Sequence, residues 1–224
     1  MGMPIDRALL ARPVLEVAPD LLGALLSHDG VTLRLTEVEA YAGPLDPGSH
    51  AYRGPTPRTQ VMFGPPGHLY VYRSYGVHWC VNVVTGEDGT ASAVLLRAAE
   101  VVEGLDLARE RRQVGVATEV VDRDLARGPG RLTKALGLDA AHDGLDLFGP
   151  GAEVRLRPGP GPVGAVRTGP RVGVSGEGGD GTRFPWRFWL EDEPTVSVYR
   201  PGTRRLGRAA RTGRHTSDPG KDPR

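Results

Sequence analysis

The stretch Val31-Thr32-Leu33-Arg34-Leu35-Thr36-Glu37-Val38-Glu39-Ala40-Tyr41 decides the fold, because its side chains alternate as they do in a half-buried β-strand. The odd-numbered residues are apolar as far as Leu35. The next residues on that register are Glu37, Glu39 and Tyr41. A carboxylate on a buried face is costly unless it is paired or hydrogen-bonded, so the second half of this strand demands an explanation.

Two interpretations of the glutamates remain open. In the first, the strand bulges or ends at Thr36 and both carboxylates are solvated. In the second, one glutamate lies in a pocket as a general base, with Tyr41 and His50 beside it. The first interpretation is favoured when the strand is considered alone.

The composition narrows the class of protein. The 224 residues are enough for one large domain, and 32 glycines with 20 prolines indicate short elements joined by many turns. The single cysteine, Cys80, permits no internal disulfide and fits a reducing cytoplasm. One cysteine and six scattered histidines show no zinc-ligand spacing. No apolar run approaches the ~20 residues that span a bilayer, so we expect no membrane partner.

The charge is unevenly distributed. Residues 202–224 hold seven basic and two acidic side chains. Because this tail is +5 and the whole chain is +1, the remainder carries −4. The tail has few apolar residues, so we expect residues 1–201 to fold and residues 202–224 to be a disordered basic extension.

The flanking sequence predicts the other elements. Helices are expected over 19–26, 101–113 and 118–126, and strands over 92–99, 153–157, 163–168, 171–175 and 184–190. Residues 43–67 read as a long irregular segment, and long loops in compact domains are usually functional or disordered. Two strand-like runs flank Ser74-Tyr75-Gly76, which indicates a hairpin with Tyr75 exposed at its tip. The glycine-rich start of a helix at Gly128 could hold an anion, although an ordinary helix start explains it as well.

These pieces, taken together, resemble the 3-methyladenine (alkyladenine) DNA glycosylase family in its bacterial form. The matching segments run in order from about residue 9 to about residue 198, and they are Thr36-Glu37-Val38-Glu39-Ala40-Tyr41, Pro66-Gly67-His68-Leu69-Tyr70-Val71-Tyr72, Cys80-Val81-Asn82, Val94-Leu95-Leu96-Arg97-Ala98, Gly128-Pro129-Gly130-Arg131-Leu132 and Gly169-Pro170-Arg171-Val172-Gly173-Val174. The resemblance implies a mixed α+β fold: one compact domain with a curved antiparallel sheet or partial barrel flanked by helices. It also implies a monomer that needs neither metal nor cofactor and acts on damaged double-stranded DNA.

The resemblance implies a role for each matching residue. Glu39 would be the general base that activates water, and Arg97 would hold the same water. Tyr41 would cover one face of a flipped purine, and His50 with Tyr72 the other. Other implied roles are a guanine-excluding contact for Asn82, a wedge that fills the vacated base stack for Tyr75, and DNA contacts for Arg58, Met62, Arg131, Lys134 and Arg171. No lysine lies near the motif to form a Schiff base, so a monofunctional glycosylase that leaves an abasic site is expected.

Two rival classes of function remain. One is a nucleic-acid-binding module of the same fold without catalysis, which would have no use for a buried carboxylate facing a polyanion. The other is a hydrolase of free nucleosides, which would need neither an exposed wedge at Tyr75 nor basic residues beside the pocket. Excision from a duplex containing one hypoxanthine or ethenoadenine would separate the three.

The hairpin register makes a prediction of its own. Directly opposed residues of an antiparallel pair share a face, so Tyr72 and Asn82 can line one pocket only if opposed residue numbers add up to an even value. A plain two-residue turn at Tyr75-Gly76 would break this parity. We therefore expect a loop of three or five residues, or a two-residue turn corrected by a bulge.

Overall fold

The computed structural model describes residues 4–159 and 164–203. Its centre is an eight-stranded antiparallel sheet that does not close, flanked by four helices, so the expected mixed α+β class is confirmed. The expected basic tail falls mainly on residues 204–224, which lie outside the described residues. Among the described residues, no helix is both long and apolar enough to cross a bilayer.

Strand β2 spans Val31–Tyr41, the bounds that its alternation predicts, and it organises the sheet. Along one edge it pairs with β5 (Ala93–Glu103). Its other edge is divided: the first residues pair with β1 (Leu25–His28) and the later ones, from Glu37 to Glu39, pair with β8 (Arg187–Leu190). The sheet therefore branches at β2. The remaining strands are β3 (Leu69–Ser74), β4 (His78–Val84), β6 (Arg155–Arg157) and β7 (Val166–Gly169).

A bulge in the β2–β5 pair moves the apolar face of β2 from odd to even residues. Leu35 is opposite Ala99, Glu37 is opposite Ala98 and Val38 is opposite Leu96, so Thr36 and Arg97 are left without partners in the ladder. Leu33 and Leu35 before the bulge, and Val38 and Ala40 after it, all belong to one hydrophobic core. The bulge at Thr36 that the first interpretation raised is therefore present, and the register does not continue. Glu37 and Glu39 face away from the main core because the bulge changes their direction.

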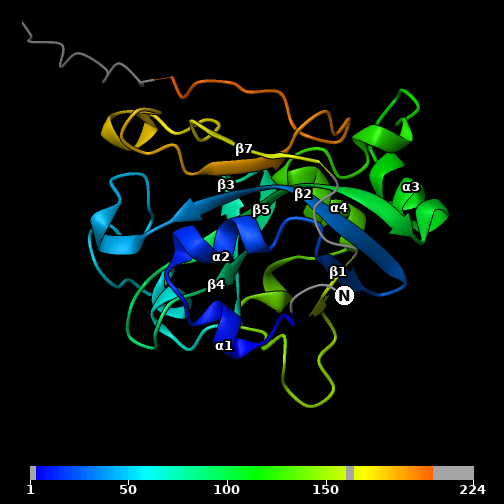
Figure 1. Cartoon of the computed structure of the whole chain (residues 1–224). Coiled ribbons are helices and arrows are strands. Elements are labelled where there is room, and N and C mark those ends of the chain that lie inside the picture. The colour runs from blue at the N-terminus through cyan, green and yellow to red at the C-terminus, as the bar shows by residue number, and fades with distance from the viewer. Residues whose placement is uncertain (1–3, 160–163, 204–224) are drawn as a thin grey trace, which may run out of the picture.

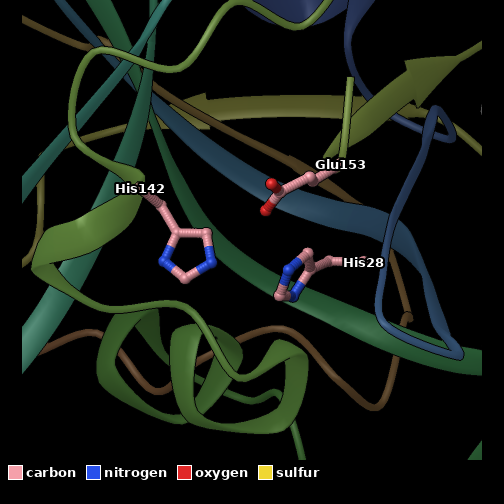
Figure 2. Close-up of side chains that lie close together, drawn as sticks. All are labelled: His28, His142 and Glu153. Carbon is pink, nitrogen blue, oxygen red and sulfur yellow. The ribbon is translucent and has the colours of Figure 1, made fainter. Parts of the chain in front are cut away.

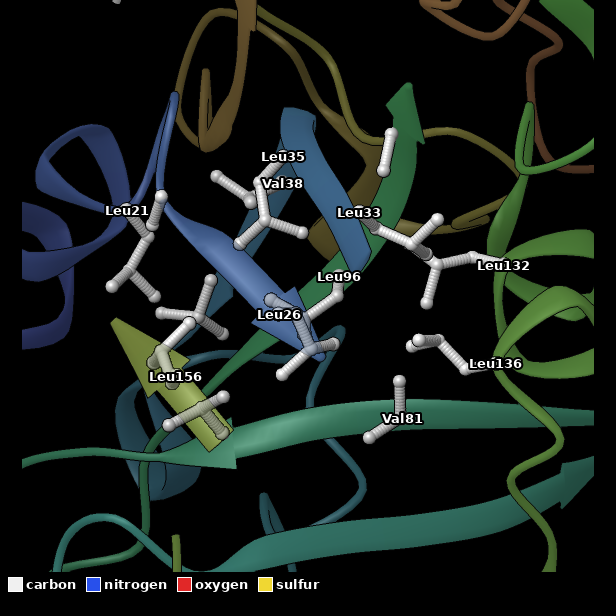
Figure 3. Close-up of a cluster of buried hydrophobic side chains, with 14 of the residues drawn as sticks. Leu21, Leu26, Leu33, Leu35, Val38, Val81, Leu96, Leu132, Leu136 and Leu156 are labelled. Atoms are coloured by element: carbon white, nitrogen blue, oxygen red, sulfur yellow. The ribbon is translucent and has the colours of Figure 1, made fainter. Parts of the chain in front are cut away.

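The main core fills the space between the sheet and two helices, α2 (Val14–Asp20) and α4 (Pro129–Leu136). Figure 1 shows α2 on one side of β2 and the segment carrying β7 on the other. Leucines from the strands and from α4 meet in this core (Figure 3): Leu26, Leu33, Leu96, Leu132 and Leu136. The opposite face of β3, β4 and β5 carries a smaller cluster that includes Met62 and Tyr70.

Three expected elements differ from the structure. Residues 19–26 do not form one helix: α2 ends at Asp20, Gly23 has a φ of 80°, and β1 begins at Leu25 because it pairs with β2. Residues 118–126 hold only the short 3₁₀ helix η3 (Asp122–Asp124), although Leu125 and Ala126 at the end of this segment are buried in the main core. Residues 171–175 form a turn rather than a strand.

The other predicted helices are shorter than expected. Residues 101–103 extend β5, and the helix that follows, α3, spans Leu105–Gln113. The helix expected after Gly128 is α4. The remaining helical elements are α1 (Arg7–Leu10) and four short 3₁₀ turns, η1 (Gly43–Leu45), η2 (Gln60–Phe63), η4 (Ala140–His142) and η5 (Glu177–Gly179). The segment 43–67 is irregular apart from η1 and η2, as expected.

The turn that follows the last residue of β2 requires a glycine. Gly43 has a φ of 56°, and a Cβ atom there would lie 1.8 Å from the backbone oxygen of Ala91. Gly54 provides a matched control because its φ is also positive, at 92°, while no atom lies within 4 Å of the added Cβ. Gly54→Ala should lower the free energy of unfolding by about 1–2 kcal/mol, the cost of the left-handed backbone. Gly43→Ala should lose about 1–3 kcal/mol more through overpacking. Urea unfolding measures both, and equal losses would contradict the close contact.

Candidate active site

The two glutamates of β2 are both completely buried, so the expectation that they are solvated is wrong. Both lie beyond the bulge, on the face opposite the main core. Glu37 and Glu39 differ in the number of hydrogen-bond donors around them. This difference distinguishes a structural carboxylate from one that can still bind a water molecule.

Glu37 is fully engaged by donors. Its Oε1 accepts hydrogen bonds from Arg187 Nε at 2.6 Å, Arg97 Nε at 3.1 Å and Ser197 Oγ at 3.0 Å. Its Oε2 accepts from the backbone N–H of Ser197 at 2.7 Å. Three of these donors meet at Oε1 and one at Oε2, so Glu37 is held by two arginines and a serine. Glu37 therefore ties β2, β5 and β8 to the segment around Ser197.

Glu39 has fewer close partners. The Tyr41 hydroxyl donates to its Oε2 at 2.9 Å, and the backbone N–H of Val172 donates to its Oε1 at 2.6 Å. The third contact, Arg97 Nη1, lies 3.5 Å from Oε1. Burial and the neighbouring Glu39 charge raise the pKa of Tyr41 well above its usual value, so the phenol keeps its proton and donates. Glu39 thus retains room to accept one more hydrogen bond.

A cavity of about 560 Å³ is bordered by the partners of Glu39. Its lining includes the residues predicted to hold the flipped base, namely Tyr41, His50, Tyr72 and Asn82, together with Arg97. Glu39 lies directly behind this lining, since its three partners Tyr41, Val172 and Arg97 all border the cavity. The structure therefore brings the predicted catalytic and base-binding residues to one place.

The aromatic side of the cavity is a packed set of rings. The His50 and Tyr72 rings meet edge to face with centroids 4.6 Å apart, and Tyr70 stacks on Tyr72 at 5.5 Å. Burial, and then the nearby Arg58 charge, lower the pKa of His50 to about 4. The imidazole is therefore neutral at physiological pH, and its Nδ1 lies 3.1 Å from the Tyr70 hydroxyl. The Asn82 amide donates to the Tyr70 carbonyl at 2.9 Å, which fixes its orientation.

The hairpin confirms the parity argument. Ser74 opposes His78, so residues 75–77 make a three-residue loop, and Tyr72 opposes Cys80 while Tyr70 opposes Asn82. Tyr75 adopts a φ of 49° and is 91% exposed at the mouth of the cavity. The tyrosine thus projects from the loop instead of packing into the core.

Of the residues predicted to contact DNA, Arg58 and Met62 border the cavity, whereas Arg131 and Lys134 do not. Arg58 lies over the Tyr72 ring at 5.1 Å and borders the cavity, as does Met62, which is only 2% exposed. Arg131 is about half exposed and lies 3.7 Å from Asp124. The Lys134 ammonium donates to the Val114 carbonyl at 2.6 Å.

Arg171 requires a correction, because it is 1% exposed and has no surface to offer DNA. Its guanidinium makes a bidentate pair with Asp46, at 2.5 and 2.7 Å, and donates to the carbonyls of Ala40 and Gly178. It also lies 4.5 Å from the Tyr41 ring centroid, so it supports the ring from behind. The sequence carried no signal for this pair, because the partners are 125 residues apart.

The Arg171–Asp46 pair allows a matched test. Arg171→Ala leaves a buried carboxylate without its partner, which should lower the free energy of unfolding by about 3–5 kcal/mol. Arg183→Ala removes an arginine whose pair with Glu177 is more than half exposed on both sides, so its cost should be about 0–1 kcal/mol. Urea unfolding of both variants checks the difference. A loss at Arg171 no larger than that at Arg183 would contradict a structural role for the buried pair.

Comparisons with known proteins show the family of the chain. The sequence model of the methylpurine-DNA glycosylase family (MPG) matches residues 8–194. A Streptomyces avermitilis protein named "Putative 3-methyladenine DNA glycosylase" is 56% identical over 92% of this chain and 96% of its own length. Proteins with the same name from Frankia casuarinae and Mycobacterium bovis are 56% and 48% identical, covering 86% and 90% of this chain and 92% and 97% of their own lengths. The chain belongs to the methylpurine-DNA glycosylase family of base-excision repair enzymes.

Proposed function

We propose that the chain flips alkylated or deaminated purines out of duplex DNA and hydrolyses their N-glycosidic bond with a water activated by Glu39. The substrate class comprises 3-methyladenine, 7-methylguanine, hypoxanthine and ethenoadenine. The observation that carries the proposal is the buried Glu39 carboxylate directly behind an aromatic-lined cavity. We further propose that the protein acts as a monomer in the bacterial cytoplasm.

The cavity walls suit a flipped purine. Tyr41 would cover one face of the base, and His50 with Tyr72 the other, at about 1–3 kcal/mol of stacking for each base. Alkylation that gives the purine a positive charge adds a cation–π attraction to the rings. The lowered pKa of His50 supports this arrangement, because a neutral imidazole does not repel a cationic base.

The chemistry follows from the free capacity of Glu39. A water hydrogen-bonded to this carboxylate attacks C1′ of the sugar, and the base departs with the electron pair of the glycosidic bond. Glu39 takes the proton of the attacking water, and its charge stabilises the oxocarbenium-like sugar before that. Arg97, 3.5 Å from Glu39 and bordering the cavity, would hold the same water. No lysine lies near the Thr36–Tyr41 motif, which supports a monofunctional enzyme without a Schiff base.

Specificity and flipping are assigned to two further residues. Asn82, held by its bond to the Tyr70 carbonyl, would crowd the exocyclic amine of guanine and so reject the normal base. Tyr75, exposed at the mouth of the cavity, would enter the duplex and fill the space that the flipped nucleotide leaves. An exposed wedge favours DNA over a free nucleoside as the substrate. Arg58, Arg131 and Lys134 remain candidates for backbone contacts, and Met62 for the pocket side of the interface.

Replacement of Glu39 tests the chemistry. Glu39→Gln keeps the size of the side chain but removes the base, so single-turnover excision of hypoxanthine from a duplex should fall by several orders of magnitude. Binding to a duplex with an abasic-site analogue should persist. Glu37→Gln is the matched control: it should lower the melting temperature through the Arg97, Arg187 and Ser197 contacts, yet leave the excision rate of the folded fraction measurable. Near-normal excision by Glu39→Gln would move the base elsewhere.

Replacement of Tyr75 tests the wedge. Tyr75→Ala should weaken lesion capture by about ten-fold or more, the equivalent of one stacking contact, without lowering the melting temperature. Val77→Ala is the control, because Val77 is also exposed in the loop of residues 75–77 but does not border the cavity. The deficit of Tyr75→Ala should shrink when the lesion lies in a mismatch, where flipping costs less. Identical binding by the two variants would contradict the wedge assignment.

A further inference from the structure

A second group of polar side chains lies at the end of β2 that is remote from the cavity. His28 is the last residue of β1, His142 the last of η4, and Glu153 shortly precedes β6. Figure 2 shows the three side chains converging from separate segments. One possible ligand atom from each lies within 4.8 Å of the other two. The two histidines are partly buried and the glutamate is exposed.

Each imidazole is oriented by a bond at Nδ1. Nδ1 of His28 lies 2.8 Å from the Leu136 carbonyl, which can only accept, so this nitrogen carries the proton. Nδ1 of His142 lies 3.1 Å from a carboxylate oxygen of Asp139 and 3.1 Å from the backbone nitrogen of the same residue, whose N–H donates to it in a capping box. Nε2 of His28 therefore has a free lone pair. Nε2 of His142 has one in the tautomer whose Nδ1 carries the proton and donates to the Asp139 carboxylate. Metal-binding histidines in proteins are usually held in this way, by a carbonyl or carboxylate on the other nitrogen.

The donor set selects the kind of ion. Two imidazoles and one carboxylate suit a divalent transition metal, zinc above all, whereas calcium and magnesium prefer oxygen ligands. Zinc bonds of ~2.0–2.1 Å at tetrahedral angles require ligand atoms about 3.3 Å apart. Separations of up to 4.8 Å need to close by at most about 1.5 Å, and the exposed Glu153 side chain is free to move toward the two imidazoles.

We propose that His28, His142 and Glu153 bind one zinc ion, with water in the fourth position. An open hollow of about 440 Å³, bordered by His28 and Glu153, gives the ion and its water access from solvent. The site is separate from the glycosylase chemistry, because the 11 residues of β2 put about 30 Å between the two ends of the strand. The three ligands come from β1, from the segment after α4 and from the segment before β6. The ion would therefore connect the β1–β6 edge of the sheet to the segment that holds His142.

The test uses the full chain with its purification tag removed. Zinc is titrated in competition with a chromogenic chelator, and cobalt(II) is used as a spectroscopic substitute. The wild type should bind one ion and give the intense visible absorption of tetrahedral cobalt. His142→Gln should weaken binding at least 100-fold and Glu153→Gln at least 10-fold, while His68→Gln, a histidine outside the cluster, should bind as the wild type does.

A second measurement keeps the proposal falsifiable if a variant is unstable. Zinc should raise the melting temperature of the wild type by a few degrees, and it should not do so for His142→Gln or for the exposed, conservative Glu153→Gln. Excision by both variants in the presence of chelator should equal that of the wild type. Equal zinc affinity in wild type, His142→Gln and Glu153→Gln would overturn the proposal, and so would an equal loss in His68→Gln.

Discussion

The bulge that leaves Thr36 and Arg97 unpaired is the constraint on which the rest of the structure depends. Before it, the odd residues of β2 fill the main core; after it, the even residues do. One extra residue on each strand therefore turns Glu37, Glu39 and Tyr41 to the cavity side without interrupting the core. The branch of the sheet from β1 to β8 falls at the same point, so a local backbone irregularity positions the site and divides the sheet together.

Each buried carboxylate must be paired with a cation or accept hydrogen bonds from N–H groups, because an unpaired buried charge is costly. Arg97 and Arg187 reach Glu37, and Arg171 reaches Asp46, from sequence positions 60 to 150 residues away. These pairs hold the walls of the cavity in place. Glu39 stands apart because two close donors and a longer contact to Arg97 leave it unsaturated. The division between a structural and a reactive glutamate thus follows from the number of donors around each.

The sequence predicted those features that local patterns encode. Alternation gave the bounds of β2, and the parity of opposed residues required the three-residue loop that exposes Tyr75. A bulge at Thr36 is one of the two interpretations of this strand, but it is joined to solvated glutamates. The pattern did not predict that partners from distant segments would bury both carboxylates. Nor did it predict the Asp46–Arg171 pair or the turn that replaces a strand at 171–175. Such long-range contacts depend on tertiary structure, and the apolar run at 19–26 likewise became helix and strand because β2 offered a pairing edge.

Burial of the side chains that line the cavity sets the protonation states of His50, Tyr41 and Tyr72. These protonation states affect which bases the proposed enzyme can release. His50 is neutral because its pKa is about 4, and burial raises the pKa values of Tyr41 and Tyr72, so none of these three groups is a strong acid at neutral pH. A departing base therefore gains little help from a protonated neighbour. A purine made cationic by alkylation needs no such help, because it leaves as a neutral molecule. On the proposed mechanism, the walls that desolvate the catalytic carboxylate also favour bases that carry their own positive charge.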